Sequence, residues 1–162
     1  MTASRRSGFT LVELLIVVVI LAMLAAIVVP ASVGVRTETE QAAFAAELRI
    51  LVDAAALYTA KTQRDLADAS SGVIPTGFED YLDSNGWEDG TPVGGVWDSE
   101  RDAFGFASTL GVHFVSGTPK SDAYMETVDA LVDDGDLATG GFRKLAADRF
   151  AFILADELKL SR

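Results

Sequence analysis

The sequence predicts an α+β fold in which one long N-terminal helix packs by its second half against a small antiparallel sheet of about four strands. Two observations predict this fold. An apolar run from Phe9 to Val29 is followed, between Thr37 and Leu66, by apolar residues at helical spacing. Short apolar and aromatic segments separated by turn residues then occupy the second half of the chain. Helices and strands that are segregated along the chain are typical of the α+β class.

The run from Phe9 to Val29 follows a basic pair, Arg5 and Arg6, and contains one charged residue, Glu13. As a helix it would span roughly 30 Å, the thickness of the hydrocarbon core of a bilayer. The two arginines favour a cytoplasmic N-terminus, so we expect one membrane span with the rest of the chain outside. A secretory signal peptide has a shorter apolar run. An ordinary uncleaved signal anchor fits the composition equally well.

Glu13 is the feature that distinguishes these readings. A carboxylate within lipid costs about 2.5–3.5 kcal/mol on insertion scales, so such a residue usually has a partner. Cleavage between Gly8 and Phe9 would create an α-amino group on the same helix, one turn before Glu13. The carboxylate could pair with that amine or with the amine of a neighbouring copy. Alternatively, Glu13 could extend toward the lipid headgroups without a partner.

The stretch GFTLVELL, with basic residues before it and Pro30 after it, resembles the N-terminal signature of type IV prepilins and type II secretion pseudopilins. The resemblance implies that prepilin peptidase cleaves after Gly8 and that the new terminal residue, Phe9, is N-methylated. It also implies that Glu13 recruits the subunit during assembly. Pro30 matches the proline that interrupts the long helix in this family, and its missing N–H predicts a kink there.

The same resemblance implies a pilin-like organisation of the whole chain. Residues 1–8 would be a leader peptide, residues 9–35 the transmembrane and filament-core helix, and residues 36–162 the head. The head would combine the second half of the helix, a variable loop and the antiparallel sheet.

The function implied is that of a structural subunit of a type IV pilus-like filament or of a type II secretion pseudopilus. Expected partners are other copies of the chain in a helical homopolymer, the prepilin peptidase, an inner-membrane assembly platform with its ATPase, and the bilayer before assembly. The precursor would lie in the bacterial inner membrane, and the assembled subunit in a periplasmic or extracellular filament. The sequence leaves open whether the filament is a pilus or a pseudopilus, and whether the chain is a major or a minor subunit. An alternative of another class is a membrane-anchored binding module, either calcium-dependent or not, that never polymerises.

Within the head, one helix face and several strands can be assigned from the sequence. The helix face consists of apolar residues spaced four and three apart: Phe44, Leu48, Leu51, Ala55 and Tyr58. We expect it to cover the sheet, although a free amphipathic helix or a coiled-coil seam has the same pattern. The connection 67–97 carries several aromatic residues and is expected to pack onto the head, with a helical turn at 78–82. Strands are expected at 93–97, at 104–115 with a bend at Ser108-Thr109 or Gly111, at 142–145 and at 150–154, with a helix at 121–132.

Composition excludes several classes of site. The chain has no cysteine and a single histidine, His113, which excludes cysteine-based sites and histidine-rich metal centres. The net charge is −11, so binding to nucleic acid through a broad basic face is not expected. Strand alternation places His113 opposite its apolar neighbours, toward solvent. No catalytic constellation follows from residue spacing, so we expect neither an enzyme nor a cofactor.

One cluster of candidate metal ligands stands out in the segment VDALVDDGDLATG, namely Asp129, Asp133, Asp134 and Asp136. Closely spaced carboxylates around a glycine turn could hold calcium. The spacing differs from that of an EF-hand loop, because no glutamate closes the segment. The alternative is an acidic helix C-terminus followed by a solvated turn at Gly135.

Overall fold

The computed structural model describes residues 9–82 and 86–156, without the side chains of residues 27–35. The predicted leader, including Gly8, lies outside the described residues. The chain divides into two compact units, residues 1–39 and residues 40–162, and each is described by itself.

Helix α1 (Leu11–Thr62) begins in the first unit and provides the first helix of the second. The helix continues through Pro30, so the proline does not end it. The kink predicted at this residue stays a prediction. From Phe9 to Leu24 the large apolar side chains of the first unit are 44–81% exposed. Within the described residues, no helical segment has both the length and the apolar content needed to cross a membrane.

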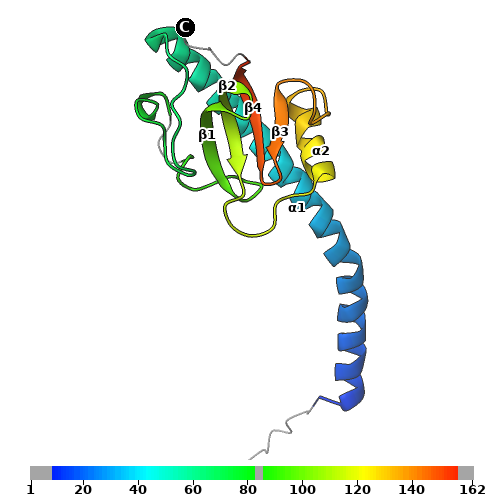
Figure 1. Cartoon of the computed structure of the whole chain (residues 1–162). Coiled ribbons are helices and arrows are strands. Elements are labelled where there is room, and N and C mark those ends of the chain that lie inside the picture. Colours follow the sequence, from blue (N-terminus) through cyan, green and yellow to red (C-terminus); the bar gives the residue numbers. More distant parts are fainter. Residues whose placement is uncertain (1–8, 83–85, 157–162) are drawn as a thin grey trace, which may run out of the picture. The chain divides into compact units, whose positions relative to one another are not determined.

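The second unit contains a four-stranded antiparallel sheet with the order β1-β2-β4-β3 (Figure 1). Its strands and its remaining helices are β1 (Val96–Ala103), β2 (Phe106–His113), β3 (Phe142–Ala146), β4 (Arg149–Ala155), α2 (Asp122–Val132) and the short 3₁₀ helix η1 (Glu79–Tyr81). Helix α2 lies beside β3, where Lys144 of the strand pairs with Asp122 of the helix at 2.6 Å. The α+β, pilin-like fold predicted from the sequence is confirmed.

The first strand does not lie where the sequence predicted it. Strand β1 begins at Val96, and most of the predicted segment 93–97 is a turn in which Gly94 and Gly95 have φ angles of 85° and 79°. The positive φ angles suit glycine, and a Cβ at Gly95 would lie 2.7 Å from the carbonyl oxygen of His113. The strand instead continues through the charged residues up to Ala103. A two-residue turn with positive φ at Phe104 and Gly105 then leads into β2, as in a type I′ hairpin.

Strand β2 is the central strand, and it passes between β1 and β4. Its register with β4 shifts between Ser108 and Thr109, where the sequence predicted a bend. Gly111 faces the backbone of β4 so closely that a Cβ there would overlap the carbonyl oxygen of Phe150. This close approach explains the glycine at the centre of a strand.

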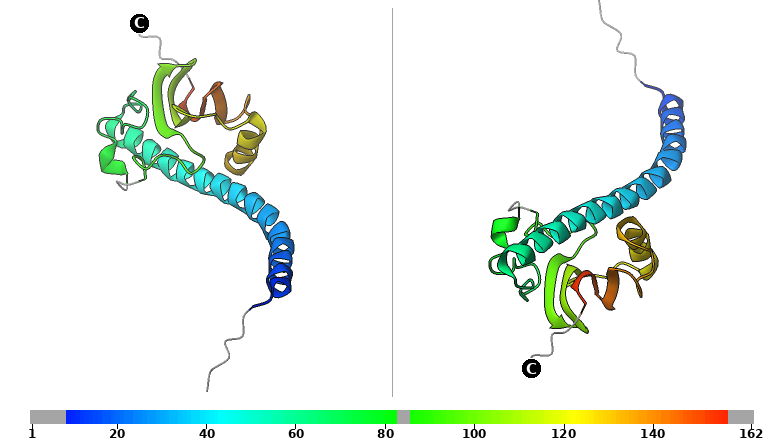
Figure 2. Two further views of the ribbon diagram at one scale, coloured as in Figure 1. Left: turned by 90° about the horizontal axis from the view of Figure 1, so that it is seen from below. Right: turned by 90° about the horizontal axis from the view of Figure 1, so that it is seen from above.

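The core lies between the sheet and the second half of α1, which runs along one side of the strands (Figure 2). All five residues of the predicted helix face are buried. Phe44 is fully buried, stacks on Trp97 of β1 at 5.2 Å between ring centroids, and meets Phe142 of β3 edge-on at 6.2 Å. The helix face therefore covers the sheet and is not a free amphipathic surface.

The connection between α1 and β1 also packs onto the core, as predicted. Phe78 and Trp87 are 0% and 2% exposed, and the predicted helical turn is η1. Helix α2 begins where predicted, because the Ser121 hydroxyl accepts a hydrogen bond from the Tyr124 amide at 3.3 Å. The last two strands agree with the prediction to within one residue at each end.

Candidate functional site

The N-terminus of α1 is closed by a reciprocal pair of hydrogen bonds between Thr10 and Glu13. The Thr10 amide donates to Glu13 Oε2 at 2.8 Å, and the Glu13 amide donates to Thr10 Oγ1 at 3.3 Å. The Thr10 hydroxyl also donates to Glu13 Oε2 at 2.7 Å. This arrangement is a capping box, in which the residue before the helix and the third residue of its first turn satisfy each other's amides.

The capping box fixes where the helix starts in relation to the predicted cleavage site. Phe9 and Thr10 are outside the helix, and the Phe9 side chain is 76% exposed. Glu13 in the single chain thus has a partner on its own helix. Sequence reasoning missed Thr10, although the spacing Thr-x-x-Glu before an apolar run is the signal for this motif. The predicted roles of Phe9 and Glu13 in processing and assembly stay predictions.

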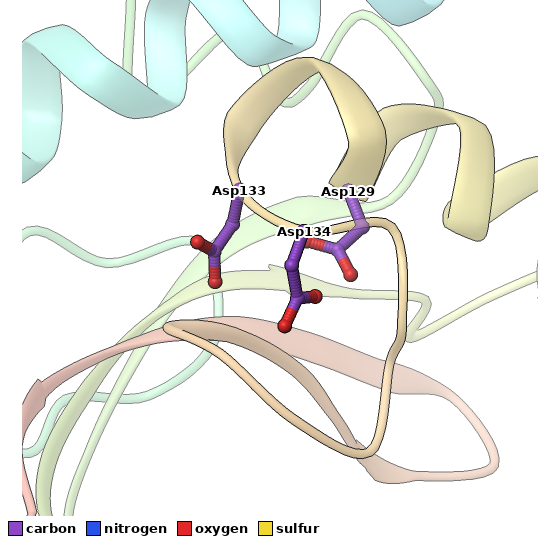
Figure 3. Close-up of side chains that lie close together, drawn as sticks. All are labelled: Asp129, Asp133 and Asp134. Atoms are coloured by element: carbon purple, nitrogen blue, oxygen red, sulfur yellow. The ribbon is translucent and has the colours of Figure 1, made fainter.

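A second group of polar side chains lies at the C-terminus of α2. Carboxylate oxygens of Asp129, Asp133 and Asp134 all lie within 4.8 Å of one another. The three side chains point away from α2 toward the loop that leads to β3 (Figure 3). The fourth candidate, Asp136, is not part of this group, and its Oδ1 accepts a hydrogen bond from the Ala138 amide at 3.0 Å.

The members of this group differ in environment. Asp129 is completely buried, whereas Asp133 and Asp134 are exposed. Burial, reinforced by the charges of Asp134, Asp133 and Asp136, raises the pKa of Asp129 to about 6. Hydrogen bonds from the Asp136 amide and from the Thr139 hydroxyl lower the pKa of Asp134. The structure thus brings together three of the four candidate ligands named from the sequence.

His113 does not face solvent, and that prediction is wrong. Its side chain is only 14% exposed, because the turn at Ser71 and the hairpin turn at Asp148 cover this face of β2. Nδ1 lies 2.7 Å from Ser71 Oγ, and Nε2 lies 3.2 Å from Asp148 Oδ2. Strand alternation correctly separated His113 from its apolar neighbours, but it cannot reveal a loop that folds over the second face.

A buried ion pair extends this polar cluster along the strands. Arg149 donates to Asp98 Oδ2 at 2.9 Å and also pairs with Glu100. Burial raises the pKa of Asp98, and the positive charge of Arg149 opposes that shift. The Ser71 turn is held to β1 by the Gly72 amide, which donates to the Trp97 carbonyl at 2.8 Å.

The contacts of Ser71, His113 and Asp148 are the reverse of those in a serine-protease triad. In such a triad the serine contacts Nε2 of the histidine and the aspartate contacts Nδ1. Here the serine is at Nδ1 and the aspartate at Nε2. The cluster is accounted for by its structural role, which is to join β1, β2, β4 and the connection that follows α1.

Comparison with known proteins finds a match in the N-terminal segment of the chain. A family model described as the prokaryotic N-terminal methylation motif matches residues 3–29. No curated protein and no solved structure gives a significant match to the chain. The matched segment includes the capping box and ends just before Pro30.

Proposed function

We propose that this chain, which carries the N-terminal signature of type IV prepilins and pseudopilins at residues 3–29, is a structural subunit of a type IV pilus-like filament or of a type II secretion pseudopilus. The precursor is anchored in the inner membrane by the segment 9–35, with the head outside. Prepilin peptidase cleaves after Gly8, and Phe9 is then N-methylated. An assembly platform driven by an ATPase adds the mature chain to a filament of identical copies.

The match to the methylation motif is the observation that carries this proposal. The motif supports a precursor of the pilin type, and the matched residues include the predicted cleavage site, the predicted methylation site and Glu13. The capping box supports the cleavage step. Because the helix begins only at Leu11, the described residues next to the scissile bond are in non-helical backbone, which a peptidase can bind in extended form.

The exposed apolar surface of α1 supports polymerisation. Fourteen successive positions from Leu11 to Leu24 include one charged residue, and the large apolar side chains among them are at least 44% exposed in the single chain. A surface of this kind needs an apolar covering, which the bilayer gives the precursor and neighbouring helices give the filament. The hydrophobic core of the second unit is built from other residues.

Glu13 has two successive partners in this proposal. In the precursor, its carboxylate is held by Thr10. After cleavage, the new amine of Phe9 lies one helical turn away on the same chain, and the amine of a neighbouring copy offers a second cation. Replacement of hydrogen bonds from uncharged donors by an ion pair with an amine, in an apolar filament core, favours the assembled state.

The test compares Glu13→Ala with Glu38→Ala in cells that contain the matching peptidase and assembly machinery. Glu38 is an exposed glutamate of the same helix outside the apolar segment, so it is the matched control. We expect Glu13→Ala to be cleaved but to be missing from sheared filaments, and Glu38→Ala to be cleaved and assembled. Assembly of Glu13→Ala at the wild-type level would contradict the role of the carboxylate. A wild-type chain that is processed but stays monomeric would favour the membrane-anchored binding module.

A further inference from the structure

A pocket of about 360 Å³ lies between α1, the connection that follows it and β1. The connection folds back against the last turns of α1, where Tyr58 of the helix meets Tyr81 of η1 edge-on at 5.4 Å between ring centroids (Figure 2). The volume is at the lower end of the range for ligand pockets, about 300–1,000 Å³. The lining residues belong to the second unit and lie outside the segment that matches the methylation motif, so binding at this pocket does not depend on the proposed function.

The pocket combines apolar walls with one charged group. With the single exception of Glu47, the side chains that line it are aromatic or aliphatic: Ile50, Leu51, Tyr81, Leu82, Trp87 and Trp97. The two indoles are almost completely buried, whereas Ile50 is 67% exposed. Such a lining suits a ligand group that has an apolar body and one positive charge.

The Glu47 carboxylate has no cation of its own in the part of the chain that the structure describes. The ion pairs among residues 9–82 and 86–156 do not include it. The Lys61 amine lies over the ring of Tyr81, 5.3 Å from its centroid, and does not pair with Glu47. Burial raises the pKa of Glu47, because the charged form loses water without gaining a positive partner. A cation in the pocket would supply that partner.

The connection that borders the pocket is acidic. Residues 79–89, EDYLDSNGWED, contain five acidic residues and no basic residue. Four of the acidic residues lie in the described part of the chain and are exposed: Glu79, Asp80, Glu88 and Asp89. The potential around the pocket is therefore negative, so it attracts a cation and repels a free carboxylate.

The apolar surface continues beyond the pocket along α1. Leu57 lies two turns after Ile50, on the same side of the helix, and is 49% exposed. A peptide whose cationic residue enters the pocket can place an apolar neighbour on this surface. A free amino acid lacks that neighbour, and its carboxylate is repelled by the acidic connection.

We propose that the pocket binds an arginine side chain of a peptide segment from a partner protein, with the guanidinium paired to Glu47. Arginine fits better than lysine, because its planar and weakly hydrated guanidinium stacks on aromatic rings and binds a carboxylate through two hydrogen bonds. Its methylene groups pack against Ile50 and Leu82. An apolar residue beside the arginine contacts Leu57.

The experiment titrates the full-length chain in detergent with the tripeptide leucine-arginine-leucine, blocked at both ends. Isothermal titration calorimetry gives the stoichiometry and affinity, and the fluorescence of Trp87 and Trp97 reports on the pocket itself. We expect saturable binding of one peptide per chain. The peptide with citrulline, which has the shape of arginine without its charge, should bind about tenfold more weakly, because the ion pair with Glu47 is lost. The peptide with lysine should also bind more weakly.

Glu47→Gln should weaken binding of the arginine peptide about tenfold and leave the affinity for the citrulline peptide unchanged, because the two losses concern the same ion pair. The midpoint of urea unfolding should not fall, since the variant removes a partly buried charge without a partner. Asp53→Asn is the matched control, because Asp53 is an exposed acidic residue of the same helix that does not line the pocket. It should bind the arginine peptide as the wild type does.

Free arginine is the probe that distinguishes a small molecule from a peptide segment. It should bind about tenfold or more weakly than the blocked peptide, because the acidic connection repels its carboxylate. Equal affinities would overturn the assignment to a peptide segment. The proposal is also overturned if the arginine peptide shows no saturable binding at millimolar concentrations, if the citrulline or the lysine peptide binds as tightly, or if Glu47→Gln and Asp53→Asn bind the arginine peptide equally.

Discussion

Phe44→Ala should remove a large part of the stability of the head. The Phe44 ring is fully buried where α1 crosses the sheet, and it contacts aromatic rings of both β1 and β3. Truncation of a buried phenylalanine costs about 3–5 kcal/mol. That range already includes the loss of ring contacts such as the two made by Phe44, so we expect a loss near its middle, about 4 kcal/mol. That is a large fraction of the roughly 5–15 kcal/mol by which a domain is stable.

The assay is urea unfolding of the full-length chain in detergent, followed by tryptophan fluorescence. Trp87 and Trp97 are 2% and 1% exposed, so both report on the core. With an m-value of about 2 kcal/mol per molar urea, the expected loss lowers the midpoint by about 2 M. If the alanine variant does not fold, Phe44→Leu takes its place in the assay. This variant retains most of the apolar volume, so it should shift the midpoint in the same direction by a smaller amount.

Ile50→Ala is the matched control, since Ile50 lies on the same helix and is 67% exposed. Its loss should change the free energy of unfolding by no more than about 0.5 kcal/mol. Equal midpoint shifts for Phe44→Ala and Ile50→Ala would refute the claim that this face of α1 covers the sheet.

Three further substitutions test other parts of the structure. Gly111→Ala should cost about 3 kcal/mol or more by urea unfolding, because its Cβ would overlap the backbone of β4, whereas Gly86→Ala, with open space around it, should be near neutral. Arg149→Leu should lower the free energy of unfolding by about 3 kcal/mol, because it leaves the buried carboxylate of Asp98 without its guanidinium partner; a change below about 1 kcal/mol would count against the ion pair. Thr10→Ala should slow cleavage about fivefold in a peptidase assay, because the N-cap that holds the helix start at Leu11, and so keeps the residues next to the cleavage site non-helical, contributes about 1 kcal/mol, and Thr10→Ser should restore the rate; an unchanged rate for the alanine variant would refute a role for the capping box.

The parts of the fold that follow from one periodic signal were predictable. The buried face of α1 has regular spacing over four turns, and tertiary contacts and local pattern agree there. The strands β3 and β4 likewise have apolar residues bounded by a short polar connection. Ser121 could be placed as an N-cap because its signal is local.

The first strand could not be predicted because its sequence carries the wrong signal. Residues Asp98 to Arg101 are mainly charged or polar, yet Asp98 and Ser99 are buried. Asp98 is tolerated inside only because Arg149, distant in the sequence, pairs with it. A partner that comes from another strand leaves no trace in the local pattern.

The candidate sites show the same division between local and tertiary information. The four aspartates near the end of α2 were visible in the sequence, but the burial of Asp129 depends on how α2 packs. His113 was assigned to the correct face of β2, and its environment was wrong because the turn at Ser71 comes from a segment that precedes the sheet. The capping box at Thr10 follows from the Thr-x-x-Glu spacing alone, whereas the cost of a carboxylate in lipid pointed to a cation as the partner of Glu13.

The most direct test of the account is the identity of the mature N-terminus. The chain should be expressed with its peptidase, purified from membranes and from sheared filaments, and measured by intact-mass and terminal-peptide mass spectrometry. The account predicts a chain that begins at Phe9 and carries one methyl group on its α-amine. A chain that still begins at Met1, or that begins beyond the apolar segment, would contradict it.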